Sequence, residues 1–462
     1  MSSRWVLLVM ASVSLLLAGF HTHAQEARTR DEMMRQIRTE KFDLVLPGAM
    51  RDNKVDMWIH VVRAGDPDPL DLDLGAHPGC PSPSLATRCL GYIVFTDRGG
   101  ERIERALFNA SGDQGLYDIR NRVDALTKFV AERDPKRIAV NMSEWLTVAD
   151  GMSHTGYLTL VKLLGDTYAK RLVSAENVIS DFRVRRVQTE IVAFAKACEM
   201  TREIEEAVFA RIVPEVTTQE ELGWWVQDQL LARGLITMPS GAPAPTALPG
   251  ITRTMEGGRP GAQRRTVYHR GDMLVWDWGL QYLNYHSDIK RHAYILREEE
   301  TDIPEGIRNA WDQGMKVRAV IRRQLKIGRT AGETLKAIAH ALEEAGFGYI
   351  PEDPSTDGGL FGVKPGAQIK LPDKTEVSVD CHCVGETGSS QIAVGPSIAP
   401  HRPDRAKVMI QPNNIFSFEF VCYIPVPGWK EKMRLNLEDN AIITERGVEF
   451  LYPTEDRLIV IR

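Results

Sequence analysis

Two carboxylates lie within one β-rich stretch, residues 271–296, whose sequence is GDMLVWDWGLQYLNYHSDIKRHAYIL. Its content of Val, Ile, Tyr and Trp predicts two strands folded back on each other. If the hairpin turns near Tyr282 and Leu283, Asp277 faces Asp288 directly, and such cross-strand partners have Cβ atoms about 4.5–5.5 Å apart. Like charges this close repel each other unless a cation lies between them. The stretch therefore indicates either a divalent-metal site or, with equal weight, a hairpin whose acids face water.

Three further side chains of metal-binding type follow in short β-rich segments of the C-terminal half. They are His382 in VDCHCVG, Glu419 in NNIFSFEFVCYIPVP and Glu438 in MRLNLEDNAIITERG. Two Asp, one His and two Glu form an oxygen-rich set that suits two hard-to-borderline divalent ions. We therefore expect Asp277 and Asp288 to converge with these three residues on one metal centre.

The order and spacing of these residues resemble the motifs of the creatinase/prolidase/methionine aminopeptidase superfamily. In that pattern a second Asp follows the first within S-D-x-x-R, a His precedes x-x-G, a Glu lies in a strand, and a Glu-Asp pair precedes T-E-x-G. The matching segments here are Asp277, Ser287–Arg291, His382–Gly385, Glu419, Glu438–Asp439 and Thr444–Gly447. The resemblance covers the chain from about Ser180 to its C-terminus.

This resemblance implies an α+β fold in which a smaller α/β creatinase-like domain precedes a pita-bread catalytic domain. The pita-bread domain, a curved antiparallel sheet flanked by helices, is expected over residues 174–462, and the N-terminal domain over residues 30–173. The predicted strands and helices of the N-terminal part alternate, which is typical of an α/β layer. A homodimer is also expected.

The resemblance further implies metal-assisted hydrolysis by an aminopeptidase or dipeptidase of Xaa-Pro type. Two divalent ions, manganese first with zinc or cobalt as alternatives, would hold a bridging water and polarise the scissile carbonyl. Asp277 and Asp288 would bridge or chelate the ions. His382 and Glu419 would complete the shell of one ion, and Glu438 would bridge both. Glu419 is also the expected general base.

Two histidines of the superfamily's peptidases are missing from this chain. No His lies between His154 and His269, and His269 is too close to Asp277 to fill the first position. The second position, seven residues after the ligand His382, is Ser389. Three functions therefore stay open: an altered peptidase, a hydrolase of another small amide, or a metal-binding homologue that has lost catalysis.

Two other histidines offer a partial substitute. Residues two apart in a strand share a face, so His286, Asp288 and His292 are expected to point the same way. Either imidazole could then act as an acid or base beside the metal. The alternative, which such positions favour, is that both are surface or packing residues.

The N-terminus predicts export. Arg4 precedes an apolar run from Trp5 to Phe20, and Thr22-His23-Ala24 follows as a small-x-small cleavage pattern. We expect a signal peptide over residues 1–24 and a periplasmic or secreted mature protein, because the run is short for an uncleaved membrane anchor. The formal net charge of -5 provides no basic footprint for nucleic acid. The expected partner is a peptide or small amide substrate, with no stable membrane span after cleavage.

Six cysteines fit an oxidising compartment. Cys80 and Cys89 bracket the loop GCPSPSLATRC, where a disulfide would contribute about 2–3 kcal/mol; two free thiols are the alternative. Cys381 and Cys383 flank His382, so they are expected to point away from the metal. Cys422 could bridge either of them, or all three could be small buried hydrophobes. The rival reading is a Cys-His-Cys zinc site.

Local patterns predict the other elements. A capping box is expected at Thr217 with Glu220 or at Thr218 with Glu221, and another at Thr330 with Glu333. Strands are expected over residues 57–62, 90–96 and 137–140, and helices over residues 30–41, 116–132, 155–164, 178–212, 304–325 and 330–344.

Overall fold

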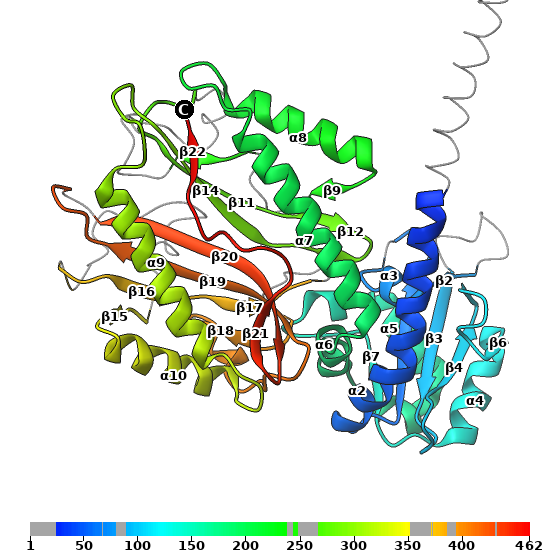
Figure 1. Cartoon of the computed structure of the whole chain (residues 1–462). Helices are drawn as coiled ribbons and strands as arrows, with labels where there is room; N and C mark the ends of the chain where they lie inside the picture. Colours follow the sequence, from blue (N-terminus) through cyan, green and yellow to red (C-terminus); the bar gives the residue numbers. More distant parts are fainter. Residues whose placement is uncertain are drawn as a thin grey trace, which may run out of the picture. The chain divides into compact units, whose positions relative to one another are not determined.

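The computed structural model describes residues 25–66, 68–79, 89–237, 244–247, 267–351, 371, 373–385, 394–429 and 432–462. The chain forms two compact units (Figure 1). The first unit comprises Met1–Ser143, Ala149–Val178 and Val187–Glu190, and the second comprises Glu144–Val148, Ile179–Arg186 and Ile191–Arg462. Because the chain alternates between the units over residues 143–191, the single predicted domain boundary at residue 174 stays a prediction.

The first unit is built on a six-stranded sheet of order β6-β4-β3-β1-β7-β8. Strand β1 runs antiparallel to β3 and parallel to β7. Buried side chains of β1, β3, β4 and β7 pack with those of α4 and α5 to form its core. The elements are residues 25–40 (helical), η1 Lys41–Val45, α2 Leu46–Asp52, β1 Met57–Arg63, α3 Asp71–Leu74, β2 Ala76–Pro78, β3 Leu90–Thr96, β4 Glu104–Phe108, β5 Ala110–Gly112, β6 Ile119–Asn121, η3 Val123–Ala125, α4 Leu126–Arg133, β7 Ile138–Val140, α5 His154–Ala169 and β8 Leu172–Ser174.

One predicted helix of this unit is wrong in its first half. Residues 116–132 were expected to be helical, but Ile119–Asn121 form β6, and α4 starts only at Leu126. Ile119 pairs with Ala106 of β4, so the sheet edge provides hydrogen-bond partners that outweigh the weak local preference for a helix. The three predicted strands and the predicted helix over residues 155–164 are confirmed.

The second unit combines β-sheets with long helices. Its largest sheet has the order β15-β16-β19-β17-β18, with β20 paired to β19 and β21 paired to β20, and a separate sheet has the order β10-β11-β14-β22. The elements are α6 Glu176–Val184, α7 Gln188–Phe209, α8 Gln219–Arg233, β9 Ile236–Thr237, β10 Thr246–Ala247, β11 Met273–Trp278, β12 Leu280–Tyr282, β13 Tyr285–His286, β14 Ile289–Ile295, α9 Glu305–Gln324, α10 Ala331–Glu344, β15 Gly348–Tyr349, β16 Glu376–Val379, β17 Cys381–Cys383, β18 Ser397–Ile398, β19 Ile415–Ile424, β20 Met433–Thr444, β21 Gly447–Phe450 and β22 Ile459–Ile461, with α6 and α7 beginning in segments assigned partly to the first unit.

Helices cover the mainly antiparallel sheet of this unit. Helix α9 lies against β20, where a Cβ on Gly314 would stand 3.0 Å from Leu437 Cδ1 (Figure 1). The absence of a side chain at Gly314 thus lets the helix backbone approach the strand closely. The α+β class expected from the sequence is confirmed. The helix predicted over residues 178–212 is in fact two helices, α6 and α7.

Both expected capping boxes are present. Thr218, rather than Thr217, is the N-cap of α8, with reciprocal hydrogen bonds to Glu221. Thr330 and Glu333 form the same arrangement at the start of α10. Each box satisfies two backbone N–H groups that a helix start otherwise leaves without a partner.

The cysteines behave differently from one another. Cys89 is disulfide-bonded, and its predicted partner Cys80 lies outside the described residues. Cys198, Cys381, Cys383 and Cys422 are buried and form no disulfide, so the suggested bridge from Cys422 is wrong and the buried-hydrophobe interpretation holds. His382 lies opposite Ser417, whereas Cys422 lies opposite Val377, five residues further along β19. At about 3.3 Å per residue, that separation far exceeds the reach of a disulfide.

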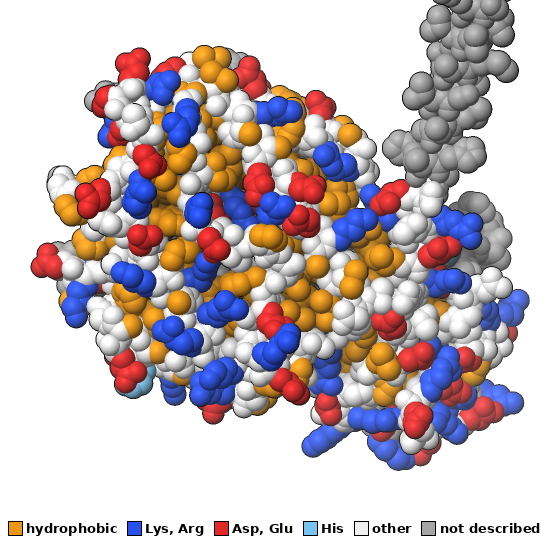
Figure 2. All heavy atoms as spheres, in the orientation of Figure 1, with side chains coloured by type: hydrophobic (Ala, Val, Ile, Leu, Met, Phe, Trp, Pro, Cys, Tyr) orange, Lys and Arg blue, Asp and Glu red, His pale blue; other side chains and the backbone are white. Residues whose placement is uncertain are grey.

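None of the described helices combines the length and apolar character needed to cross a membrane. Basic and acidic side chains are interspersed over the face shown in Figure 2, so neither sign dominates it.

The register of the β11–β14 hairpin differs from the expected one. Asp277 pairs with Lys290, not with Asp288, because the turn falls one residue later than predicted, between Tyr282 and Tyr285. Leu283 in this turn has a φ of 56°, a left-handed conformation that its residue type does not signal. The register differs by two residues along the second strand, and an even difference keeps each side chain on its face. Asp277, Asp288 and Lys290 therefore still share one side of the hairpin.

We expect Gly279→Ala to destabilise the hairpin that carries Asp277 and Asp288. A Cβ on Gly279 would stand 1.9 Å from the Ser287 carbonyl oxygen, so the two strands must move apart. Overpacking of this kind costs about 1–3 kcal/mol, and the apparent Tm should fall accordingly. The control is Gly100→Ala, where a Cβ meets nothing within 4 Å. Equal melting temperatures for the two variants would contradict the prediction.

Candidate metal centre

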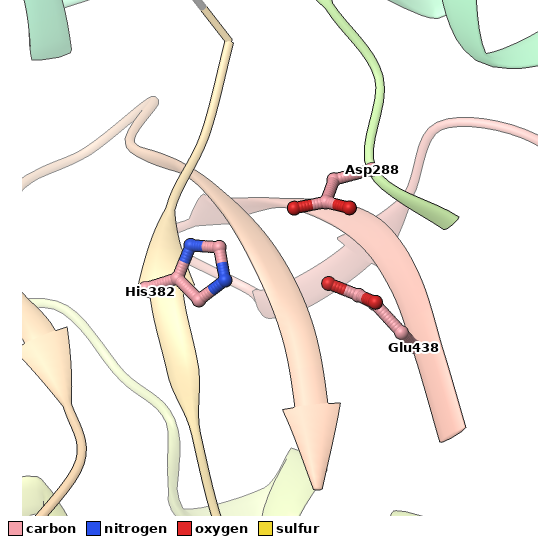
Figure 3. Close-up of side chains that lie close together, drawn as sticks. All are labelled: Asp288, His382 and Glu438. Atoms are coloured by element: carbon pink, nitrogen blue, oxygen red, sulfur yellow. The ribbon is translucent and has the colours of Figure 1, made fainter. Parts of the chain in front are cut away.

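The antiparallel pairing of β19 with β20 places Glu419 directly opposite Glu438. On the other side of β19, His382 of β17 lies opposite Ser417, two residues before Glu419 and therefore on its face. Figure 3 shows His382, Glu438 and Asp288, the residue before β14, pointing toward one another. Each offers one ligand atom, and these atoms all lie within 4.8 Å of one another.

The remaining two predicted ligands lie at the same place. Glu419 Oε2 is 3.7 Å from His382 Nε2, and Glu419 Oε1 accepts a hydrogen bond of 3.1 Å from Asn436 Nδ2. Asp277 Oδ2 is 3.1 Å from Lys290 Nζ, which also contacts Glu419. The structure thus brings all five residues together, and their roles as metal ligands stay predictions.

Lys290 lies among these carboxylates, and the sequence analysis missed it. Its ammonium donates to Glu419 Oε1 at 2.8 Å and to Glu438, in addition to pairing with Asp277. Its side chain is only 5% exposed. A signal was available, because Lys290 follows Asp288 by two residues in a strand and so shares its face.

The charges of the cluster shift the pKa values of its members in opposite directions. Burial, reinforced by the charge of Asp277, raises the pKa of Asp288 to about 7. Burial, with Asp288 and Glu419 nearby, raises the pKa of Glu438 well above its usual range. Burial alone would also raise the pKa of Glu419, but the Lys290 ammonium and His382 hold it well below its ordinary value. The carboxylates surrounding Lys290 outweigh burial and raise its pKa.

The backbone of Asp288 is fixed by a side chain of β20 that the sequence analysis also missed. Asn440 Nδ2 donates to the Asp288 carbonyl oxygen at 2.7 Å, and the Asp288 N–H donates to Asn440 Oδ1 at 2.9 Å. The hydroxyl of Ser417 in turn donates to Glu438. Two short, uncharged polar side chains, Asn440 and Ser417, therefore help to hold the cluster in place.

His286 and His292 lie elsewhere. His292 is fully buried, its Nδ1 is 3.0 Å from Glu455 Oε2, and its ring lies edge-on to Trp311. Burial lowers the pKa of His286 to about 4, so that imidazole is neutral at neutral pH. Within the described part of the chain, neither ring hydrogen-bonds to or pairs with any of the five clustered side chains. Their expected acid–base role stays a prediction that these contacts do not support.

A second polar group lies next to His382. Arg402 Nη1 donates to Asp380 Oδ1 at 2.5 Å and to Ser397 Oγ at 2.8 Å, and His401 Nε2 is 3.7 Å from the same Asp380 oxygen. Burial and then the charge of Glu419 raise the pKa of Asp380. The sequence analysis did not use His401 or Arg402, which are two adjacent basic residues that follow a β-rich segment. Ser389 lies outside the described residues.

This arrangement fits a divalent cation. Carboxylates and one imidazole are donors that such ions accept, and their ligand atoms lie within 4.8 Å of one another. Residues 193–445, more than half of the chain, match the model of metallopeptidase family M24. This chain belongs to metallopeptidase family M24. The superfamily resemblance seen in the sequence is thereby confirmed, and the chain is a metallopeptidase-like hydrolase whose family implies divalent metal ions.

Similar proteins agree with this family. The Xaa-Pro dipeptidase of Pyrococcus furiosus is 23% identical over 296 residues, which cover 63% of this chain and 69% of that protein. The solved X-Pro aminopeptidase from Thermotoga maritima has a TM-score of 0.58 and 15% identity, over 90% of this chain and 100% of its own. The prolidase from Pyrococcus horikoshii has a TM-score of 0.54 and 18% identity, over 91% and 99%. These structures confirm the fold expected for a chain of the M24 family.

Glu205 of α7 leads us to predict how the stability of the fold depends on pH. It is fully buried, neither carboxyl oxygen has a hydrogen-bond partner among the described residues, and burial raises its pKa well above the usual range. Above the unfolded-state pKa of about 4.5, the folded state then binds more protons than the unfolded state, so stability falls as pH rises. Glu205→Gln removes this loss, and its advantage in apparent Tm over the wild type should grow from pH 5 to pH 8.

The matched control for this experiment is Glu206→Gln. Glu206 is the neighbouring residue, 51% exposed and paired with Arg202. Its melting temperature should follow that of the wild type at every pH. A constant difference between Glu205→Gln and the wild type across this pH range would count against the prediction.

Proposed function

We propose that the chain is an exported metal-dependent peptidase of Xaa-Pro type. The observation that carries the proposal is the convergence of Asp288, His382 and Glu438 with Glu419 on an M24 chain. The names of similar proteins, an Xaa-Pro dipeptidase and an X-Pro aminopeptidase, support a peptide bond next to proline as the target.

The residues of the site have distinct tasks in this proposal. Asp288, His382 and Glu438 would hold a divalent cation, which supplies Lewis-acid activation of water and of the scissile carbonyl. Lys290 and His382 keep Glu419 ionised, so its carboxylate is in the form that can accept a proton from the attacking water. It then delivers that proton to the leaving nitrogen. Asn440 positions Asp288 through its backbone.

A second candidate function is a metal-binding homologue with altered or lost catalysis, or a hydrolase of another small amide. Two observations favour it: the sequence has Ser389 where the superfamily's peptidases have a histidine, and a lysine lies among the carboxylates. Metal binding without hydrolysis of any Xaa-Pro peptide would select this candidate.

Manganese is the proposed metal because four of the five donors are carboxylates, with zinc and cobalt as alternatives. The expected pair of ions stays a prediction, because Lys290 lies beside Asp277. We also propose a homodimer, to be tested by sedimentation of the mature chain.

The catalytic test uses residues 25–462, stripped of metal and reloaded with Mn²⁺, Zn²⁺ or Co²⁺. We expect metal-dependent hydrolysis of Xaa-Pro dipeptides or Xaa-Pro-Yaa tripeptides. Glu419→Gln should lower kcat by about 10²–10⁴-fold, the usual contribution of a general base. Glu449→Gln, on strand β21, is the control and should keep full activity. Equal rates for both variants would show that Glu419 is not the base.

Export is tested separately, because residues 1–24 lie outside the described residues. Mature protein from the native host should begin at or near Gln25, as read by N-terminal sequencing. A chain that retains Met1 or Ser2 in the cytoplasmic fraction would disprove this part of the proposal.

A further inference from the structure

Lys290 lies between three of the clustered carboxylates. Its Nζ is 3.1 Å from Asp277 Oδ2 and 2.8 Å from Glu419 Oε1, and it donates to Glu438 as well. The lysine side chain is 5% exposed, and that of Glu438 is 1% exposed. A buried charge is costly unless it is paired, and here a single ammonium is paired with three carboxylates. Lys290 thus acts as a cation that belongs to the chain itself.

The carboxylates form two overlapping groups. Asp277, Glu419 and Glu438 surround the ammonium. Asp288, His382 and Glu438 form the group whose ligand atoms lie within 4.8 Å of one another, and Asp277 does not belong to it. Glu438 is the member that the two groups share. The five predicted ligands are therefore divided between an ammonium and one position suited to an ion.

We propose that the Lys290 ammonium takes the place of one of the two divalent ions, so that the centre binds a single ion per chain. That ion would be held by Asp288, His382 and Glu438. This inference rests on the metal centre of the proposed function and goes beyond it by fixing the number of ions and giving Asp277 a different partner.

Electrostatics and space both support a single ion. The ammonium paired with Asp277 and Glu419 repels a second divalent cation placed on those two carboxylates, and the repulsion is strong where water is excluded. A second ion next to Asp277 would require the Lys290 side chain to leave a position where it is almost fully enclosed. Without the lysine, the four carboxylates would be neutralised by two bound ions. With it, the folded chain itself supplies the positive charge that the second ion would bring.

The experiment counts ions. The chain comprising residues 25–462 is stripped with a chelator, saturated with Co²⁺ or Mn²⁺, freed of excess ion and measured for metal per chain by elemental mass spectrometry. We expect one ion in the wild type and two in Lys290→Ala and Lys290→Ser. Lys432→Ala is the matched control, because Lys432 is an equally buried lysine whose Nζ pairs with Glu376 at 2.7 Å, away from the five clustered residues. It should bind one ion.

Asp277 provides a second, independent count. With Lys290 present, Asp277→Asn should leave the single ion in place, and in the Lys290→Ala background it should reduce two ions to one. Anomalous diffraction at the cobalt edge would locate the ions: one peak beside Asp288, His382 and Glu438 in the wild type, and an additional peak beside Asp277 in Lys290→Ala.

The outcomes separate this inference from the proposed function. Two ions in the wild type, or one ion in every folded Lys290 variant, would overturn the role of Lys290 and leave a metal-dependent peptidase possible. No ion in the wild type would overturn both. If circular dichroism shows that neither Lys290 variant folds, the wild-type count and the Asp277→Asn count still decide, because loss of the ion in Asp277→Asn contradicts the inference.

Discussion

The pairing of β19 with β20 places two glutamates face to face, and the surrounding structure is arranged to make that repulsion tolerable. At about 4 Å, two like charges in a protein environment repel by about 4 kcal/mol. Donors approach Glu419 and Glu438 from several strands: Lys290 from β14, Ser417 from β19 and Asn436 from β20. Each donates a hydrogen bond to one of the two carboxylates. The need for positive charge at this point is thus a property of the fold before any metal binds.

The alternation of side chains along the strands keeps this charged cluster separate from a second one. Glu438 faces Lys290, while its neighbour Asp439 accepts hydrogen bonds from Arg291 and Tyr452. Both pairs are buried, and removing one partner of such a pair leaves an uncompensated charge. Adjacent residues on two strands therefore serve different purposes, one pair at the candidate metal centre and one in the structure behind it.

Much of the fold and the members of the candidate site were accessible from the sequence, and the reasons for the misses are physical. Helix ends with a capping box, such as Thr330 with Glu333, carry their signal within four residues. The five clustered residues were found through a motif order, which does not depend on register. The pairing of Lys290 with Asp277 does depend on register, and the register follows a turn in which Leu283 has a left-handed conformation that its residue type does not signal. Asn440 was invisible for a similar reason, since its partner is the backbone of a residue far away in the chain.

The two hydrogen bonds of Asn440 also connect two sheets of the structure. A primary amide presents a donor and an acceptor side by side, as the N–H and C=O of one residue in a β-strand do, so Asn440 behaves toward Asp288 like a strand partner one residue long. It joins the β11–β14 sheet to the β19–β20 sheet where backbone pairing between them is absent among the described strands. An aspartate in its place could accept but, once ionised, could not donate. The joint between the two sheets thus depends on the difference between a single nitrogen and a single oxygen.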